Sequence, residues 1–346
     1  ITTPCPRSMG FRTRFGGAVS GASGVTEGEE IVMALPIYRP APASANAPLN
    51  ATRLTVRALW PATMSTPHPA SVFTEKTMPH ITTSDGIRIH YEEQGHGRPI
   101  VMIHGWTFSG RFFHRNIGPI SEQARVITVD LRGHGRSEKP SHGYRIARLA
   151  ADLRDLLVAL NLRDVTVLGW SIGCPVIWSY LELFGSERIR NAIFVQQTPK
   201  QYYSADWKLG HADCYDQAGL TAVQQQLTLT PEDFDRANLE NCICHPLPDE
   251  EKAFLLREMA QSPAHARSAM MADHTTQDWR DVLPHLTLPA LMMVARKDTI
   301  LNPEGPAWVA QHMPNCSSMD FEDSAHMVFL DETEKFNRSV LEFLKT

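Results

Sequence analysis

Three side chains that lie far apart in the sequence have the types that nucleophilic catalysis requires. Ser171 lies in the sequence Gly-Trp-Ser-Ile-Gly at residues 169–173, Asp298 follows an apolar run, and His326 lies close to the C-terminal end. A serine hydroxyl is a poor nucleophile at neutral pH, so it needs an imidazole base that an acid holds in place. We therefore predict a catalytic triad in which Ser171 is the nucleophile, Asp298 the acid and His326 the base.

Residues 169–173 are predicted to form a sharp turn between a strand and a helix. The apolar run Val165–Leu168 precedes them, and a helical pattern follows over Gly173–Phe184. A serine at such a turn has a strained backbone at the carboxyl edge of a sheet, and the flanking glycines let strand and helix approach closely. The five-residue pattern also occurs in turns without a function, so its flanks are what favour a nucleophile here.

Asp298 is the acid that the predicted strands bring to the same edge. It follows the strand expected over Ala290–Val294, and ligands and catalytic groups of parallel sheets gather at the carboxyl ends of the strands. The other position for an acid, directly after the strand expected over Ala192–Val195, holds Gln196, Gln197 and Thr198. Asp298 is therefore the only acid in place.

His326 has the position expected of the base. It follows a strand expected near Cys316–Phe321 and precedes the final helix, so its imidazole can meet both Asp298 and Ser171. Ten other histidines lack a place at the sheet edge and are interpreted as bystanders: His80, His90, His96, His114, His142, His211, His265, His274, His285 and His312.

Two backbone N–H groups are expected to bind the negative charge that develops on a substrate carbonyl oxygen. The N–H of Ile172 lies at the start of the predicted helix, where it has no partner within the helix. The second is expected from the loop after Ile100–Ile103, in His104-Gly105-Trp106, and we predict Trp106. Loss of one such donor typically lowers the rate about a hundredfold to a thousandfold, so this oxyanion hole matters as much as many side chains.

Strand and helix patterns alternate from residue 79 onward, which is typical of a mostly parallel sheet with helices on both faces. The fold class is therefore predicted to be α/β with a doubly wound sheet. The expected strands are Ile87–Tyr91, Ile100–Ile103, Arg125–Val129, Val165–Leu168, Ala192–Val195 and Ala290–Val294, and the expected helices are Ile146–Leu160, Gly173–Phe184, Pro303–His312 and Thr333–Leu344.

A segment from about Pro199 to Leu286 interrupts this alternation with helices alone. Thr230 and Ser262 each precede a proline, which predicts two helix N-caps with proline at the first helical position. We predict an inserted helical cap over residues 199–286, and a core made of residues 79–198 and 287–346.

The predicted cap is rich in apolar side chains, most of which are interpreted as packing against the core. The remainder is expected to line a cavity beneath the cap, which favours an apolar or aromatic small-molecule substrate. The candidate pocket residues are His104, Trp170 and Trp207.

The first 78 residues have a different composition, with nine prolines and many Ala, Ser, Thr and Gly residues. No helical or strand period is sustained there, so we expect little fixed structure. Three arginines near the start suggest a targeting peptide, but the glutamates that follow do not fit one. Because Met78 immediately precedes the patterned part, residues 1–78 are interpreted as an extension upstream of a natural start near Met64 or Met78.

Composition and charge exclude several classes of function. The 346 residues include 33 basic and 38 acidic side chains, for a formal net charge of −5 without a block of like charge, so nucleic acid is not an expected partner. The longest apolar runs are far shorter than the roughly 18 residues that a membrane-spanning helix requires. Six cysteines are too few for a disulfide scaffold and favour a cytoplasmic location.

Neither a metal nor an organic cofactor is expected. Cys242-Ile243-Cys244-His245 has ligand-type side chains, but no second cluster at the spacing of a zinc site accompanies them. No glycine-rich phosphate loop follows the first strand, so a nucleotide cofactor is not indicated.

The chain from about residue 79 to 346 resembles the α/β-hydrolase superfamily. Within it, the chain is similar to the cofactor-free branch of small esterases, lactonases and bacterial non-haem haloperoxidases, which act through a Ser-His-Asp triad. The resemblance implies the same roles for Ser171, Asp298, His326, Trp106 and Ile172. It rests on His-Gly-Trp at 104–106, Asp-Leu-Arg-Gly-His-Gly-Arg-Ser at 130–137, Gly-Trp-Ser-Ile-Gly at 169–173, Asp298 and His326.

Three positions depart from the pattern of this family. Cys174 stands where a small residue, usually glycine, follows the turn, and Ala325 replaces the glycine usual before the histidine. Ile172 stands where haloperoxidase-like members commonly carry methionine, which makes a perhydrolase less favoured. Epoxide hydrolases and haloalkane dehalogenases of the superfamily use an aspartate nucleophile, so Ser171 argues against both.

The expected function is hydrolysis of a carboxylic ester or a lactone through an acyl-enzyme intermediate. Three alternatives keep the same fold: a cofactor-free perhydrolase, a hydrolase of carbon–carbon bonds, and a receptor that binds a ligand with little turnover. Assays on esters, on ring-fission products and for peracid formation would separate the enzymes, since the fold alone hosts many activities.

Overall fold

The computed structural model describes residues 79–346. Residues 1–78 lie outside the described part, and so does the prediction that they lack fixed structure. Within the described part, the strands and helices follow one another in nearly the order that the sequence pattern predicts.

An eight-stranded sheet forms the centre of this part of the chain, in the order β1-β2-β4-β3-β5-β6-β7-β8. β1 and β2 pair in antiparallel fashion, β2 and β4 do the same, and all the remaining pairs are parallel. The predicted mostly parallel sheet is confirmed. The strands are β1 His80–Thr82, β2 Arg88–Gln94, β3 Pro99–Ile103, β4 Arg125–Val129, β5 Val165–Trp170, β6 Ile189–Val195, β7 Ala290–Ala295 and β8 Cys316–Phe321.

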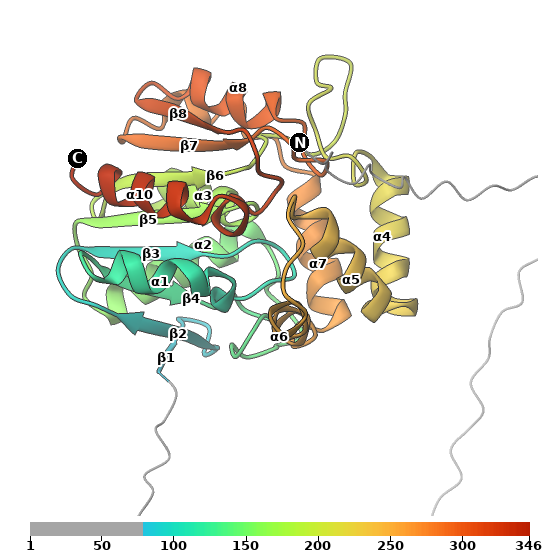
Figure 1. The fold of residues 1–346 in the computed structure, drawn as a ribbon, viewed down its shortest axis with the longest axis horizontal. Helices are drawn as coiled ribbons and strands as arrows, with labels where there is room; N and C mark the ends of the chain where they lie inside the picture. Colours follow the sequence, from blue (N-terminus) through green and yellow to red (C-terminus); the bar gives the residue numbers. More distant parts are fainter. Residues whose placement is uncertain (1–78) are drawn as a thin grey trace, which may run out of the picture. The chain divides into compact units, whose positions relative to one another are not determined.

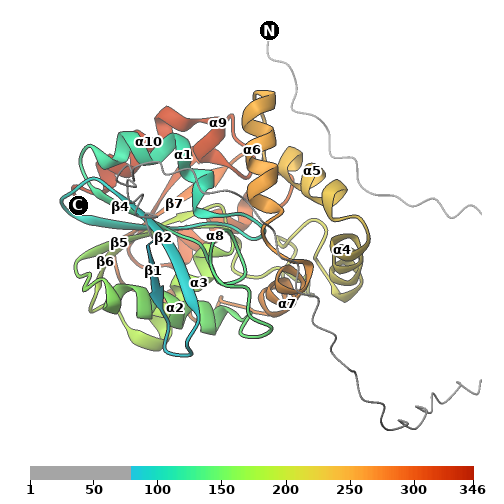
Figure 2. The ribbon, with the colours of Figure 1, turned by 90° about the horizontal axis from the view of Figure 1, so that it is seen from below.

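Helices cover both faces of this sheet (Figure 1). Figure 2 shows α1, α9 and α10 on one face and α2 and α3 on the opposite face. These helices, with α8 packed on β7 and β8, are α1 His114–Ser121, α2 Ile146–Ala159, α3 Gly173–Phe184, α8 Glu304–His312, α9 Val328–Asp331 and α10 Thr333–Phe343.

Two apolar cores lie on the two faces of the sheet. Side chains of a strand alternate between faces, so Val167 of β5 belongs to one core and Leu168 to the other. Every residue of β5 is buried because helices cover both of its faces. The strand is two residues longer than predicted, since Gly169 and Trp170 continue its pairing with β6.

Four α-helices lie between β6 and β7, grouped beyond the sheet in Figure 1: α4 Gln217–Leu229, α5 Pro231–Asn241, α6 Asp249–Met259 and α7 Ala264–Thr275. Asn238 of α5 donates a hydrogen bond to the Thr107 hydroxyl at 3.0 Å, and the indole of Trp106 donates to the carbonyl of Arg267 on α7 at 2.9 Å. These contacts hold the helices against the loop that follows β3. The structure thus has helices between β6 and β7 where the sequence pattern predicts them, and their role as a cap with limits at 199 and 286 stays a prediction.

One of the two predicted N-caps is at the wrong residue. Thr230 does precede α5, which begins with Pro231, although its side chain makes no capping hydrogen bond. α7 begins at Ala264 with Pro263 at the N-cap, so the prediction of Ser262 is wrong. The reason is that Pro263 has an extended backbone, with ψ at 150°, and therefore lies outside the helix.

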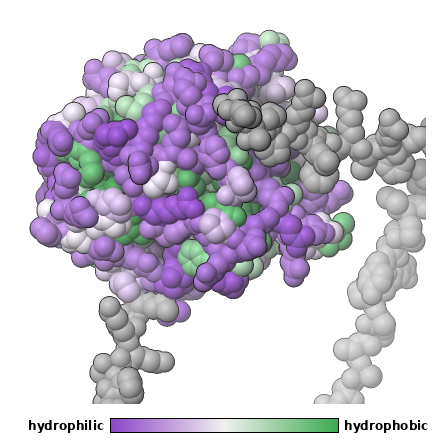
Figure 3. Space-filling model, viewed as in Figure 1, coloured by the Kyte–Doolittle hydropathy of each residue, from purple (hydrophilic) through white to green (hydrophobic). Residues whose placement is uncertain are grey.

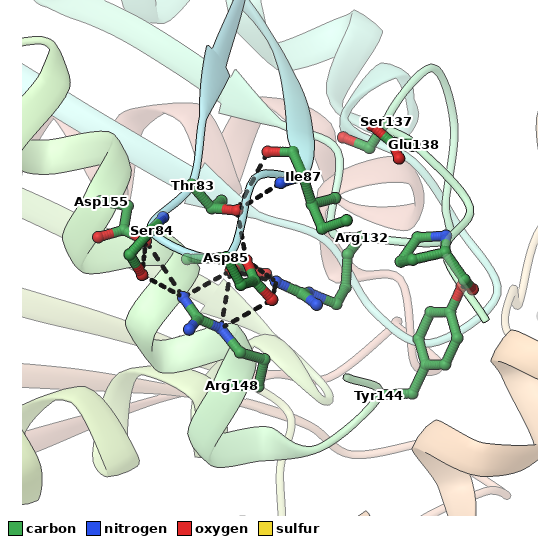
Figure 4. Close-up of polar contacts among 12 residues, drawn as sticks. Thr83, Ser84, Asp85, Ile87, Arg132, Ser137, Glu138, Tyr144, Arg148 and Asp155 are labelled. Atoms are coloured by element: carbon green, nitrogen blue, oxygen red, sulfur yellow. Dashed lines mark hydrogen bonds and ion pairs between the residues drawn. The ribbon is translucent and has the colours of Figure 1, made fainter. Parts of the chain in front are cut away.

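An ion cluster around the buried Arg132 ties the loop after β4 to α2 and to the turn between β1 and β2. Figure 4 shows Asp85 between Arg132 and Arg148. The fully buried guanidinium donates to Asp152 at 2.6 and 2.7 Å and to Asp85 at 3.0 Å. In the same loop the Leu131 N–H donates to the ring of His104 at 3.0 Å. The cluster thereby holds the loop after β4, and the bond to His104 ties the loop after β3 to it.

Replacing Asp152 by asparagine should lower the free energy of unfolding by about 3 kcal/mol or more, because the buried Arg132 charge would lose its principal anionic partner. Urea denaturation measures the change. Asp164→Asn is the matched control, since its pair with Arg190 is exposed and should contribute less than about 1 kcal/mol. Equal losses in the two variants would show that the Arg132 cluster does not stabilise the fold.

The surface seen in Figure 3 is mainly hydrophilic, with hydrophobic residues in small separate patches. Within residues 79–346, no helix has the length and apolar character to cross a membrane. The apolar residues of this part of the chain are concentrated in the two cores.

Candidate active site at the carboxyl edge of the sheet

Four neighbouring strands, β5 to β8, end side by side at one edge of the sheet. The register places Trp170, the last residue of β5, beside Val195, the last residue of β6. It likewise places the last residues of β7 and β8 beside each other. The segments that follow these ends therefore share one rim, and they carry Ser171, Gln196, Asp298 and His326.

Ser171 lies in the strained turn that the sequence predicts. Its φ is 52°, a left-handed conformation, and its N–H donates to the Val195 carbonyl at 2.9 Å. A Cβ added at Gly169 would lie 2.5 Å from the backbone of Gly173, and one added at Gly173 would lie 2.6 Å from the Ile103 carbonyl oxygen. The prediction that both glycines permit a close approach of strand and helix is confirmed.

Asp298 and His326 form a buried hydrogen-bonded pair. The ring Nδ1 of His326 lies 2.7 Å from Oδ2 of Asp298, and the Ile300 N–H donates to Oδ1 at 2.8 Å. Since an ionised carboxylate only accepts, Nδ1 carries the proton and Nε2 is the ring atom that can take a second one. Within residues 79–346, the Ser171 hydroxyl makes no hydrogen bond to this ring.

Gln196 contacts the same carboxylate, which the sequence analysis did not predict. Its Nε2 donates to Oδ2 of Asp298 at 2.8 Å, and its Oε1 accepts from the Ala295 N–H at 2.7 Å. The one sign of this role in the sequence is that position 196, directly after β6, is a possible position for the acid but holds an amide. That this amide faces Asp298 becomes visible only in the structure, where β6 and β7 end side by side.

The two predicted oxyanion donors lie on the loops that flank this rim. Ile172 is the N-cap residue of α3, and the first N–H groups of a helix have no partner within it. Trp106 follows β3, and its ring packs edge-on against Phe234 of α5, with centroids 5.7 Å apart. The Trp106 side chain is thus anchored in the inserted helices, and its role as a donor stays a prediction.

His104 uses both ring nitrogens within the loops. Its Nδ1 donates to the Gly105 carbonyl at 2.7 Å, and its Nε2 accepts from the Leu131 N–H at 3.0 Å. Burial lowers the pKa of His104, so the ring remains neutral in this position. Neither nitrogen is left for a substrate, which favours a role in holding the Trp106 loop over the predicted role in a pocket.

The other two predicted pocket residues are also packed against the protein. Trp170 is fully buried, and its indole donates to the His326 carbonyl at 2.9 Å, which fixes the backbone of the imidazole. Trp207 donates to the Lys200 carbonyl at 3.0 Å and packs edge-on against Trp308 of α8. Their part in a substrate pocket stays a prediction.

His211, one of the histidines interpreted as bystanders, lies near Asp298 and His326, and His274 lies near His211. The segment of His211 pairs with the loop after Asp298, since the Ala212 N–H donates to the Ile300 carbonyl at 2.8 Å. Nδ1 of His211 accepts from two backbone N–H groups at 3.0 Å, so the proton is on its Nε2. Burial lowers the pKa of His211 and lowers that of His274 to about 3. Both rings are therefore neutral at neutral pH.

His274 should make the protein less stable as the pH falls from about 6 to 4. In that range the unfolded chain binds a proton on this histidine and the folded chain does not, so stability falls by roughly 1.4 kcal/mol per pH unit. Urea denaturation across this range should show that His274→Leu lacks this component. His96→Leu is the control, because His96 is exposed, and its pH dependence should match that of the wild type. If the free energies of unfolding of wild type and His274→Leu differ by the same amount at every pH, the expectation is wrong.

The motif Cys242-Ile243-Cys244-His245 is tied to the core through its backbone. The Cys242 carbonyl accepts from the Met327 N–H at 2.9 Å, and the N–H groups of Cys244 and His245 donate to Asp331. Among residues 79–346, no group of three or more His, Cys, Asp or Glu side chains is arranged to hold a metal ion. The motif therefore braces the segment beside His326.

Cys174, one of the departures from the family pattern, fills a buried position behind the turn. Its Sγ donates to the Gly169 carbonyl at 3.0 Å, and burial raises the pKa of the thiol far above its usual range. The thiol is therefore a packing group that the turn accommodates.

Comparison with known proteins agrees with the observed fold. A family model described as the alpha/beta hydrolase fold matches residues 98–333. A non-heme chloroperoxidase from Kitasatospora aureofaciens is 32% identical over 277 residues, which are 77% of this chain and 99% of the relative. The structure of an esterase from Exiguobacterium antarcticum has a TM-score of 0.74 at 26% identity, with 77% of this chain and 99% of the esterase covered. A bromoperoxidase from Bacillus anthracis has a TM-score of 0.72 at 25% identity, with 78% and 100% covered.

Proposed function

Because this chain belongs to the alpha/beta hydrolase fold family, we propose that it is a serine hydrolase that cleaves carboxylic esters or lactones. Ser171 is the nucleophile, His326 the base and Asp298 the acid that orients it. The observation that carries the proposal is the buried 2.7 Å hydrogen bond between Asp298 and His326, on the rim that Ser171 shares. An imidazole with its proton held on Nδ1 can accept the hydroxyl proton at Nε2.

In the first half of the reaction, Ser171 Oγ attacks the carbonyl carbon while its proton passes to Nε2 of His326. The carbonyl oxygen becomes an oxyanion, which the N–H groups of Trp106 and Ile172 stabilise. The intermediate collapses when the carbon–oxygen bond to the leaving group breaks. The imidazolium returns its proton to the leaving alkoxide, and an acyl-Ser171 ester remains.

In the second half, a water molecule gives a proton to Nε2 of His326 and attacks the acyl carbon. The new oxyanion occupies the same two N–H groups, and its collapse releases the carboxylic acid and restores the Ser171 hydroxyl. Asp298 stays ionised throughout and stabilises the imidazolium that forms in each half.

We expect a small to medium, mainly apolar substrate. The helices inserted between β6 and β7 place apolar side chains near the Trp106 loop, with Phe234 against the Trp106 ring and Met270 and Met271 in the same core. Small-molecule sites are predominantly apolar with few polar groups that fix orientation. We expect the acyl group or the alcohol group to lie among these side chains.

A panel of p-nitrophenyl esters of increasing acyl length, with simple lactones beside them, tests the substrate class. We expect turnover of short to medium esters and an optimum in acyl length that moves when Phe234 is replaced by alanine. Turnover of ring-fission diketones with no turnover of esters or lactones would instead assign a carbon–carbon bond hydrolase. Stoichiometric binding without repeated turnover would assign a receptor.

A second candidate is a perhydrolase, which the similarity to a protein named non-heme chloroperoxidase favours. In that reaction hydrogen peroxide replaces water as the attacking group, so the acyl-enzyme gives a peracid rather than an acid. Monochlorodimedone halogenation with acetate, bromide and peroxide detects the peracid. A peracid rate well above the rate of ester hydrolysis would favour this candidate.

We propose a small-molecule substrate as the principal partner and a cytoplasmic location, the latter on the sparse cysteines of the sequence. Fractionation of the cells that produce the protein tests the location.

A further inference from the structure

Gln196 lies on the rim beside Asp298, and the mechanism above does not use it. Its side chain is fully buried, and it follows β6, between β5 and β7. Its φ is 48°, a left-handed conformation that is strained for a non-glycine residue. Ser171 has the same kind of strain at the neighbouring strand end. Such strain persists only where the surroundings hold the residue, and it clusters at functional sites.

The backbone of β7 fixes which way the Gln196 amide points. The N–H of Ala295 can only donate, and it lies 2.7 Å from one end of the amide, which must therefore be Oε1. The other end is then the NH₂ group, which faces Oδ2 of Asp298 at 2.8 Å. The N–H of Gln196 donates to the Met293 carbonyl at 3.0 Å, so the residue is held to β7 at both its backbone and its side chain.

Asp298 is surrounded by donors on both oxygens. Oδ2 accepts from Gln196 and from the ring of His326, and Oδ1 accepts from the Ile300 N–H. Donors on both sides prevent the carboxylate from rotating away from the imidazole. Hydrogen bonds to the charged form also favour the ionised carboxylate. The Gln196 amide donates this hydrogen bond without adding a charge, whereas an ionised acid at position 196 would add a second negative charge beside Asp298.

We propose that Gln196 is a positioning residue of the triad, which holds the ionised Asp298 carboxylate against His326 and keeps a single negative charge at this site. The proposal rests on the proposed serine hydrolase function for its kinetic readout. It predicts that the charge at position 196, and not only the packing there, sets the protonation of the imidazole.

Gln196→Glu tests the charge directly, because glutamate has almost the same shape. A second carboxylate within hydrogen-bond distance of Asp298 favours the protonated imidazole. The acidic limb of kcat/KM against pH, measured on a short aryl ester, should therefore move to higher pH by about one unit or more. An unchanged limb in a folded, active Gln196→Glu enzyme would overturn the proposal.

Asn191→Asp is the matched control. Asn191 is also a buried amide on β6, but it lies five residues earlier, toward the opposite edge of the sheet, and accepts from Thr166 at 2.6 Å. At about 3.3 Å per residue the added charge is more than 15 Å away. The pH profile of this variant should match the wild type. A shift equal to that of Gln196→Glu would show a general charge effect and would also overturn the proposal.

Gln196→Met removes the donor while it keeps the length of the side chain. The Asp298 carboxylate loses one of its constraints, so kcat should fall roughly tenfold to a hundredfold with KM changed less than about twofold. This variant carries the test if Gln196→Glu does not fold. An unchanged kcat in Gln196→Met would count against the positioning role.

Proton NMR separates this proposal from the proposed function. The low-field resonance of the His326 Nδ1–H, assigned by its loss in His326→Gln, should shift in Gln196→Glu and exchange faster with water in Gln196→Met. If it responds in this way while the wild type hydrolyses no ester, the positioning role stands and the hydrolase function fails. If esters are hydrolysed and neither the resonance nor the pH profile responds, the positioning role fails alone.

Discussion

Replacement of Ser171 by alanine should lower kcat/KM for a short aryl ester by about 10⁴–10⁶-fold, the largest effect we expect from any single change. The variant keeps the Asp298–His326 pair and the oxyanion donors but has no atom to form the acyl-enzyme. KM should change little, since binding groups remain. Steady-state kinetics with the purified protein measure the loss, and turnover within tenfold of the wild type would exclude Ser171 as the nucleophile.

Ser171→Gly and Ser179→Ala show whether a loss of activity comes from the missing hydroxyl or from a change in folding at this turn. Ser171 has a φ of 52°, so an alanine there retains the backbone strain, whereas Ser171→Gly relieves it. We expect Ser171→Ala and Ser171→Gly to be equally inactive, and Ser171→Gly to be at least as stable as Ser171→Ala. Ser179→Ala is the control, because Ser179 is a buried serine on the helix α3 that follows the turn. It should retain nearly full activity.

Asp298→Asn should lower kcat by about 10³–10⁴-fold. The Ile300 N–H holds one side-chain oxygen, so the new NH₂ group would face both the Gln196 NH₂ and the ring of His326. A donor at that point favours the imidazole tautomer whose proton is on Nε2, and this tautomer cannot accept the Ser171 proton. Steady-state kinetics measure the loss.

The exposed acid Asp323 provides the control for this change. It lies three residues before His326 and pairs with Lys297 on the surface. Asp323→Asn should leave kcat within about twofold of the wild type, since exposed ion pairs contribute little. A small effect of Asp298→Asn, no larger than that of Asp323→Asn, would show that the buried acid does not orient the base.

Short-range patterns allowed the turn at Ser171 to be predicted well. The apolar run before it predicts a buried strand, and the glycines on either side are needed because a Cβ at Gly169 or Gly173 would touch backbone within 2.6 Å. The pairing of Asp298 with His326 followed from a general property of parallel sheets, whose carboxyl ends meet at one edge. In the structure β7 and β8 are neighbours whose last residues lie beside each other, which is why Asp298 and His326 meet.

Residues whose role depends on distant contacts were not predicted. The amide of Gln196 contacts Asp298 only because β7 ends beside β6. The sequence alone indicates merely that position 196 holds no acid. His274 lies on α7 and is buried because the inserted helices fold against the core, which no local pattern shows. His104 was expected in a pocket, but the loop after β4 occupies one of its nitrogens. The catalytic roles themselves stay predictions.

Labelling with a fluorophosphonate, which reacts with activated serine hydroxyls, tests the central claim most directly. The wild-type protein should take up one phosphonyl group, peptide mass spectrometry should locate it on Ser171, and ester turnover should fall in proportion to the labelled fraction. Complete modification of Ser171 with undiminished turnover, or a label on a different residue in parallel with the loss of activity, would contradict the account.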